Sequence, residues 1–194
     1  MTDITQNKKY QAVFSTAKDL FWKYGIKRVT IEEICQKAGV SKMTFYKFFP
    51  HKIALAKTIL EKTMEESLTK FEDIVRSDLP FTEKVKGFFQ LKLEVSKDIS
   101  IEFITDINHG AHAELGKSME AAGLRSQRIF VDFLLESQSR GLIRKGLKIE
   151  FILHYLNHSQ HFMEDERLRS LYDHPQDLIM EIMDFLFYGL MPHQ

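Results

Sequence analysis

The sequence predicts an all-α protein in which a small N-terminal head of three helices is joined to a larger helical body. Three observations predict this fold class. Apolar residues recur at three- and four-residue spacing over most of the chain, no segment sustains the alternation of a strand, and glycines and prolines divide the chain into segments of helical length. We place the head in residues 1–50 and the body in residues 51–194.

The first predicted helix covers residues 6–24, where apolar side chains fall on one face. Those side chains are Val13, Ala17, Leu20, Phe21 and Tyr24. Gly25 follows them directly, and a glycine at this position is typical of a helix C-terminus.

Two short helices follow, over residues 31–38 and 42–48, and each has its own start signal. Thr30, with a glutamate three residues later, predicts a capping box before the first helix, and Ser41 is a typical cap for the second. Gly39 between them suits the left-handed conformation that ends a helix. Two helices separated by so short a turn must cross steeply, which is the helix-turn-helix arrangement.

Prolines and glycines divide the body into six further helices. The predicted ranges are 51–76, 82–98, 100–108, 116–140, 149–171 and 176–189. No internal repeat or low-complexity linker interrupts them, so we expect the long helix over residues 51–76 to join the head to the body.

The charge is unevenly distributed along the chain. The whole chain contains 27 basic and 27 acidic residues, so its formal net charge is zero. Residues 1–55 contain ten basic and four acidic residues, a net charge of +6, and the remainder therefore carries −6. A basic head on an acidic body is typical of a protein whose head contacts a polyanion.

Cysteine usage and the lack of long apolar runs predict a cytoplasmic protein that has no membrane partner. Cys35 is the only cysteine, so an intramolecular disulfide framework is excluded. No segment approaches eighteen uninterrupted apolar residues, and the N-terminal stretch lacks the apolar core of a signal peptide.

The start of the second short helix carries side chains that suit DNA. In a helix-turn-helix, the second helix presents its N-terminal residues to the major groove. The residues at this position are Lys42, Met43, Thr44, Tyr46 and Lys47. Such side chains are an unusual choice for a helix that only has to bury itself, so we predict a DNA-contacting surface here.

The stretch TIEEICQKAGVSKMTFYKFFPHKIAL, residues 30–55, together with AKDLFWKYGIKRVT before it, resembles the N-terminal domain of TetR-family transcriptional regulators. Its caps, glycine, valine, tyrosine, aromatic-proline pair and following lysine all fall in the family's register. The resemblance implies a dimeric DNA-binding regulator that is no enzyme and is associated with the nucleoid when bound. It further implies a repressor that a small, largely apolar or aromatic effector releases from a palindromic operator.

The resemblance also implies which head residues touch operator DNA, mostly at phosphates. These are Thr30, Ser41, Lys42, Thr44, Tyr46, Lys47 and Lys52. Met43 departs from the family pattern, which often has a small residue there, so we expect an apolar base contact, for example to a thymine methyl group. His51 and Ile53 also depart from the pattern, and we expect both to affect local packing only.

The body contains eleven of the sixteen phenylalanines, and most of them must be core. The resemblance implies a pocket for the effector among the body helices, and large aromatic surfaces suit an apolar or flat ligand. The candidate pocket walls are Phe88, Phe89, Phe103, Phe130 and Phe133. Helical spacing alone does not separate side chains that line a pocket from side chains that fill a core.

The segment LIMEIMDFLFYGLM, residues 178–191, is apolar around too much of its circumference for a surface helix of a monomer. With the helix over residues 149–171, it predicts a homodimer held by a four-helix bundle across a twofold axis. The interface residues that we expect are Leu178, Ile182, Phe185 and Leu186. The alternative is a helix buried inside one subunit.

His154, His158 and His161 recur at helical spacing and could offer metal ligands on one helix face. The sequence offers no partner group to complete a ligand set, so we predict no metal site and no cofactor. A metal-dependent enzyme that uses this face is therefore a weak alternative to the regulator. A helical adaptor that binds protein in place of DNA is a second alternative.

Overall fold

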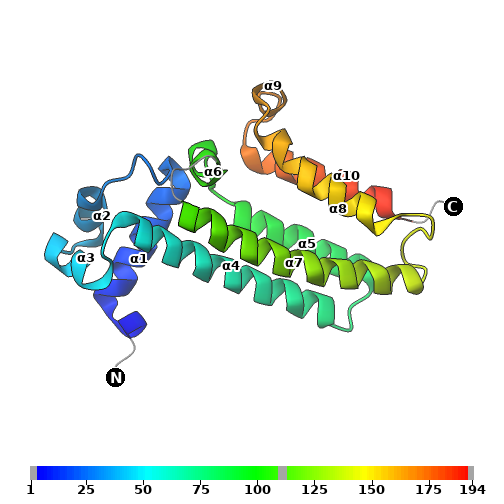
Figure 1. Cartoon of the computed structure of the whole chain (residues 1–194), viewed down its shortest axis with the longest axis horizontal. Helices are drawn as coiled ribbons and strands as arrows, with labels where there is room; N and C mark the ends of the chain where they lie inside the picture. Colours follow the sequence, from blue (N-terminus) through cyan, green and yellow to red (C-terminus); the bar gives the residue numbers. More distant parts are fainter. Residues whose placement is uncertain (1–3, 109–112, 192–194) are drawn as a thin grey trace. The chain divides into compact units, whose positions relative to one another are not determined.

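The computed structural model describes residues 4–108 and 113–191, and this part of the chain contains helices and no strand, which confirms the all-α prediction (Figure 1). The elements are η1 (Ile4–Gln6), α1 (Lys8–Tyr24), α2 (Ile31–Ala38), α3 (Lys42–Phe48), α4 (Lys52–Arg76), α5 (Phe81–Ser96), α6 (Ile101–Asn108), α7 (Ala113–Ser139), α8 (Ile149–Ser159), η2 (Gln160–Met163), α9 (Glu166–Arg169) and α10 (Pro175–Leu190). None of the described helices is long and apolar enough to cross a membrane.

The single helix predicted over residues 149–171 is wrong, because α8 ends at Ser159 and a 3₁₀ turn and a short helix follow it. Asp165 explains the new start, since its backbone is extended and its carboxylate accepts a 3.0 Å hydrogen bond from the amide of Leu168. An N-cap of this kind begins a helix and cannot lie inside one.

The chain divides into two compact units. The first unit comprises Met1–Glu65 and Asp98–Ala121, and the second comprises Glu66–Lys97 and Ala122–Gln194. The boundaries between these units fall within α4, between α5 and α6, and within α7. The functional boundary predicted at residue 50 is a different division, and it stays a prediction.

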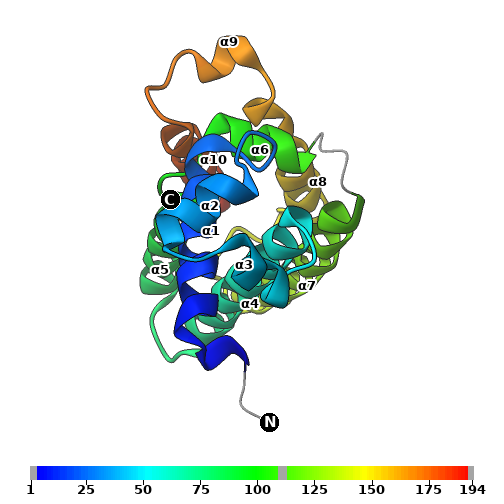
Figure 2. The same cartoon turned by 90° about the vertical axis from the view of Figure 1, so that its left-hand side faces the viewer.

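The first unit has a core that α1, α2 and α3 share with the first turns of α4. Figure 2 shows α2 and α3 beside α1, an arrangement in which all three helices contact one another. The fully buried side chains include Val13, Phe21, Ile34, Phe45, Leu55 and Ile59. Phe103 from α6 and Leu115 from α7 belong to the same cluster, so the core that supports the helix-turn-helix draws on residues well beyond residue 50.

The second unit has an aromatic core. The rings of Phe81 and Phe133 stack with centroids 5.7 Å apart, and Phe88 meets Phe133 edge to face at 5.2 Å. Aliphatic side chains complete the cluster; they include Leu134, Ile143, Ile152 and Leu190. Each interacting aromatic pair adds stability beyond the area that it buries, about 0.5 to 1.5 kcal/mol.

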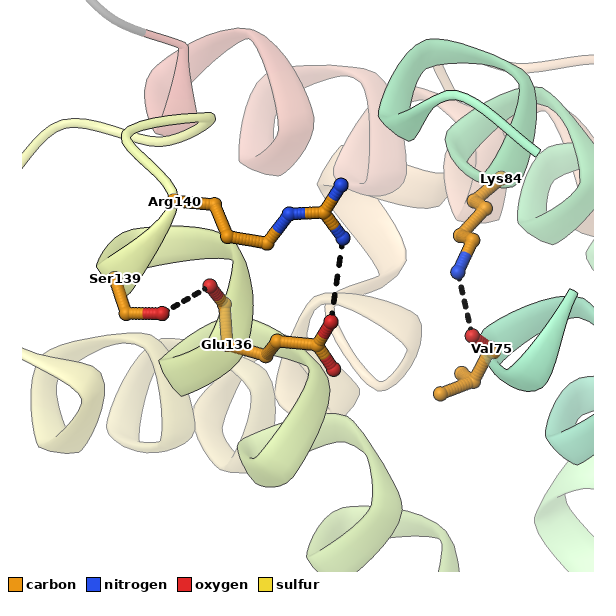
Figure 3. A network of polar contacts seen from close by, with 5 residues as sticks. All are labelled: Val75, Lys84, Glu136, Ser139 and Arg140. Atoms are coloured by element: carbon orange, nitrogen blue, oxygen red, sulfur yellow. Dashed lines mark hydrogen bonds and ion pairs between the residues drawn. The ribbon is translucent and has the colours of Figure 1, made fainter. Parts of the chain in front are cut away.

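Side-chain bonds close the turn after α4 and the end of α7 in the second unit (Figure 3). The ammonium of Lys84 donates a 2.6 Å hydrogen bond to the carbonyl of Val75 across the α4–α5 turn. At the end of α7, Arg140 donates to the carboxylate of Glu136 at 3.2 Å, and the hydroxyl of Ser139 donates to the Glu136 carbonyl at 2.7 Å. The Lys84 bond gives the carbonyl of Val75, at the end of α4, a donor. At the end of α7 the Glu136 carbonyl accepts from the Arg140 amide as well as from Ser139.

Candidate nucleic-acid interface

The α2–α3 turn is built from the caps that its sequence predicts. Gly39 has φ 66° and ψ 33°, the left-handed conformation, and the amide of Val40 donates to the carbonyl of Cys35 at 3.0 Å. The hydroxyl of Ser41 then accepts a 3.2 Å hydrogen bond from the amide of Thr44 and starts α3. The turn therefore ends one helix and starts the next within three residues.

Only half of the predicted capping box forms at the start of α2. The hydroxyl of Thr30 accepts a 3.1 Å hydrogen bond from the amide of Glu33. The carboxylate of Glu33 lies 3.7 Å from the ammonium of Lys37, one turn further along the helix. Thr30 thus caps α2, while Glu33 pairs along the helix surface.

Helix α3 separates a buried anchor from an exposed surface. Phe45 is fully buried, and its ring meets Tyr46 edge to face at 5.5 Å. Met43 is 71% exposed and Tyr46 is 53% exposed, while Lys47 is also exposed. Met43 and Tyr46 thus leave more than half of their surface exposed on a seven-residue helix, which suggests a partner surface.

Two hydroxyl groups lie together at the start of α3. The side-chain oxygens of Ser41 and Thr44 are 3.0 Å apart, with Ser41 exposed and Thr44 half-buried. Thr30 is exposed at the start of α2. Hydroxyls and free amides at helix N-termini are good donors to phosphate oxygens, so all three residues can donate hydrogen bonds to the phosphates of a DNA backbone.

Lys42 is paired within the unit. Its ammonium donates a short hydrogen bond to the carboxylate of Glu32 on α2, and both side chains are exposed. This hydrogen bond raises the pKa of Lys42 and lowers the pKa of Glu32. Lys42 must therefore exchange a carboxylate for a phosphate before it can contribute to DNA binding.

Lys52 is the first residue of α4, and its ammonium is bonded within the unit. Its ammonium donates hydrogen bonds to the carbonyls of Val29 at 2.6 Å and Lys27 at 3.1 Å, in the loop before α2. Burial lowers the pKa of Lys52, and the carboxylate of Asp106 opposes this shift. These bonds make Lys52 a support of the loop that leads into the helix-turn-helix, and its phosphate contact stays a prediction.

A second support of the same loop comes from α6. The carboxylate of Asp106 accepts a 2.8 Å hydrogen bond from the amide of Lys27, and Gly25 has a φ of 80°. A β-carbon at Gly25 would lie 2.7 Å from the Asp106 carboxylate oxygen. Sequence reasoning missed this contact because the partners are 79 residues apart, and the glycine was explained by the helix end alone.

His51 is the N-cap of α4. Its Nδ1 accepts a 3.1 Å hydrogen bond from the amide of Ala54. The ring therefore caps the helix in place of the small residue that the family pattern has there. The proton of a neutral ring then lies on Nε2. The departure at His51 therefore concerns local structure, as expected.

The five phenylalanines expected to line an effector pocket separate into two groups. Phe103 belongs to the core of the first unit, where its ring lies 4.4 Å from that of Trp22. Phe88 and Phe133 are buried in the core of the second unit, and the half-buried Phe89 and Phe130 pack against the same core. A ligand-lining role for these side chains stays a prediction.

The predicted dimer residues face two directions on α10. Leu178 is 2% exposed and Leu186 is buried, so both are occupied within the chain. Phe185 is 71% exposed, and Ile182 is half-buried. The structure thus changes the candidate set: Leu178 and Leu186 leave it because they have no surface to offer a partner.

Three further residues take their place beside Ile182 and Phe185. Phe151 on α8 and Tyr188 on α10 are exposed, and the ring of the half-buried Tyr155 stacks on that of Phe185 at 6.0 Å. We call these five residues, Phe151, Tyr155, Ile182, Phe185 and Tyr188, the α8–α10 face. The sequence could not separate these exposed residues from the buried ones, because an almost fully apolar helix does not show in its sequence which side faces its own core.

The three histidines lie along α8 and the turn that follows it. The rings of His154 and His158 are 3.9 Å apart, and Nδ1 of His158 is 2.9 Å from the carbonyl of His154. Nδ1 of His161 is 3.1 Å from the carboxylate of Glu164. Within residues 4–108 and 113–191, no group of three or more His, Cys, Asp or Glu residues has an arrangement that could hold a metal ion.

A family model described as "Bacterial regulatory proteins, tetR family" matches residues 13–59, which contain α2, α3 and the turn between them. The HTH-type transcriptional regulator RutR of Escherichia coli K12 is 34% identical over 90 residues, which are 46% of this chain and 42% of RutR. The chain therefore spans less than half of this curated relative. The uncharacterised HTH-type regulator YerO of Bacillus subtilis is 26% identical over 79% of this chain and 55% of its own length.

The likeness to solved structures extends over the whole chain. The reduced form of Escherichia coli NemR matches 97% of this chain and 100% of its own chain, with a TM-score of 0.71 and 11% identity. At this identity, the match shows a shared fold and nothing about a ligand.

Proposed function

Because the chain belongs to the tetR family of bacterial regulatory proteins, we propose that it is a dimeric transcriptional regulator that binds palindromic operator DNA through α3. The observation that carries this proposal is the exposed start of α3. Met43 and Tyr46 are held out by the buried anchor Phe45, and Lys47 stands beside them. This combination suits a major groove bordered by phosphates.

The proposed division of labour follows from the geometry of each side chain. Thr30, Ser41, Thr44, Tyr46 and Lys47 contact phosphates and fix the register, and Lys42 joins them when it leaves Glu32. Met43 contacts a base edge. Lys52 and Asp106 support the loop behind this surface through their bonds to the backbone of residues 27 and 29. Contacts to phosphate supply affinity, and contacts to base edges supply specificity.

The proposed dimer forms through the α8–α10 face. Three exposed aromatic side chains on two adjacent helices, Phe151, Phe185 and Tyr188, make a patch that a monomer rarely leaves in water. A twofold arrangement of this face gives a four-helix bundle, and two heads related by a twofold axis match a palindrome.

The proposed regulation is release from the operator by a small effector that binds the aromatic body. We place such a protein in the cytoplasm, and at the nucleoid when it is bound to DNA. The effector must prefer one spacing of the two heads by about 1 to 3 kcal/mol in order to change operator affinity by roughly 5- to 150-fold. Operator DNA must then change effector affinity by the same factor.

Selection from a library of random-sequence duplexes tests the DNA-binding proposal. The full chain is expected to enrich a palindromic motif whose half-sites are about 10 base pairs apart, or a multiple of this. A folded Tyr46→Ala/Lys47→Ala variant is the control and should enrich nothing. If the unaltered chain enriches no motif, an adaptor that binds protein is the better description. The enzyme alternative has no support from the relatives, which are named as regulators.

A further inference from the structure

Glu32 places a negative charge at the edge of the surface that is proposed to meet DNA. The helix-turn-helix, residues 30–48, contains two acidic residues, Glu32 and Glu33. The Glu32 carboxylate accepts a short hydrogen bond from the ammonium of Lys42, the first residue of α3. Lys42 lies on the same side of α3 as the exposed Tyr46, because residues four positions apart on a helix are neighbours. The pair therefore sets a carboxylate beside the exposed part of α3.

The two glutamates have different partners, although both lie in the first turn of α2, where a carboxylate favours the positive end of the helix dipole. Glu33 is half-buried and lies 3.7 Å from Lys37 on the same helix. The Glu32 side chain is 62% exposed and reaches Lys42 on the next helix. An exposed ion pair contributes little to stability, so the fold gives little reason for a glutamate that neutralises a lysine of α3.

The pair controls how much positive charge the start of α3 offers to DNA. Binding to DNA of arbitrary sequence depends almost entirely on basic side chains that neutralise phosphates and release their counterions. An ammonium that is bonded to Glu32 neutralises no phosphate, and the carboxylate beside it repels the DNA backbone. Lys42 can change partner only where α3 is seated in the groove and brings a phosphate within its reach. The pair thus acts differently on a seated and on a loosely bound α3.

We propose that Glu32 is a specificity-determining residue: it keeps Lys42 from the phosphates of non-operator DNA and gives it up when α3 is seated in the operator. This inference deepens the proposed function and rests on its DNA-binding surface. Glu32 acts against the wrong complex and adds no contact to the right one. Specificity is a difference between two affinities, so a residue that weakens binding to non-operator DNA raises it.

The affinities of the full chain for two duplexes of equal length test the proposal. One duplex is the palindrome selected from the random library, and the other is a shuffled version of it. Glu32→Gln should raise affinity for the shuffled duplex by about 5-fold or more and steepen its salt slope by about 1 per head, because Lys42 becomes free to contact a phosphate. Affinity for the palindrome should rise less, because an exposed pair costs little to break, and its salt slope should stay the same. The ratio of the two affinities should therefore fall.

Glu33→Gln is the matched control, because it removes the same charge from the same turn of α2 and leaves Lys42 paired. It should change neither salt slope. Lys42→Met should weaken binding to the palindrome and leave binding to the shuffled duplex nearly unchanged. Three results would overturn the proposal: an unchanged affinity ratio in Glu32→Gln, an equal effect of Glu33→Gln, or a slope for the shuffled duplex that Glu32→Gln steepens as much when Lys42→Met is also present.

A second measurement tests the pair without DNA. The hydrogen bond from Lys42 lowers the pKa of Glu32, so the Glu32 carboxyl should titrate at a higher pH in Lys42→Met than in the unaltered chain, as followed by NMR. An unchanged titration would show that the pair does not form in solution and would overturn the proposal. If the unaltered chain selects no palindrome, the DNA-binding proposal fails and this inference fails with it. A selected palindrome whose discrimination ignores Glu32→Gln contradicts this inference alone.

Discussion

Helix α3 and the α8–α10 face both expose large apolar side chains, but their charged neighbours differ. On α3, the exposed Met43 and Tyr46 lie between Lys42, which pairs with Glu32, and the exposed Lys47. On α10, the exposed Phe185 lies next to the exposed Asp184. Lysines attract a polyanion and a carboxylate repels it, so the same degree of exposure indicates DNA in one region and a protein partner in the other.

The largest effect that we expect tests the assignment of the α8–α10 face to a protein partner. Phe151→Asp with Phe185→Asp should weaken dimerisation by at least about 100-fold, because buried unpaired carboxylates cost several kcal/mol. Sedimentation should show a folded monomer at micromolar concentration. Leu171→Asp is the control, since Leu171 is equally exposed but lies outside the α8–α10 face. A dimer that persists in the double variant would place the interface elsewhere.

The next largest effect is expected at Gly25, in the loop that leads into the helix-turn-helix. Gly25→Ala should destabilise the chain by about 1 to 3 kcal/mol, because it combines a φ of 80° with a β-carbon 2.7 Å from the Asp106 carboxylate. Gly39→Ala is the matched control: its φ is 66°, but nothing lies within 4 Å of an added β-carbon. Denaturant unfolding should rank Gly25→Ala as the more harmful change. The reverse order would remove Asp106 from the support of this loop.

These supports also show what the sequence could and could not predict. The caps Ser41 and Thr30 and the turn glycine Gly39 were predictable because each acts on residues at most four positions away. The bonds of Lys52 and Asp106 to the loop before α2 were not, because they join residues 23 to 79 positions apart.

The candidate dimer surface was only partly predictable for a related reason. An apolar helix indicates that much of its surface is buried, but not which side faces the core. The sequence therefore placed the buried Leu178 in the same candidate interface as the exposed Phe185. The direction depends on which neighbouring helix α10 packs against, and this is a property of the folded chain. The fold class needed no such information, because helical spacing is local.

Lys47 and Lys52 test which lysines near α3 contact DNA phosphates. Lys47→Met should lower the slope of log affinity against log salt by about 1 per half-site, because one phosphate contact releases about one counterion. Lys52→Met should instead reduce the free energy of unfolding by about 1 to 2 kcal/mol, since the carbonyls of Lys27 and Val29 lose their donor. Equal salt slopes in the two variants would return Lys52 to the DNA surface.

The central claim is that α3 lies in the major groove with Met43 against a base. The direct measurement is the affinity of the unaltered chain and of Met43→Ala for the selected palindrome and for every single-base change in it. The account predicts that Met43→Ala removes discrimination of about 1 to 3 kcal/mol at one position of each half-site and preserves it elsewhere. A uniform loss at all positions, or no change at any, would contradict it.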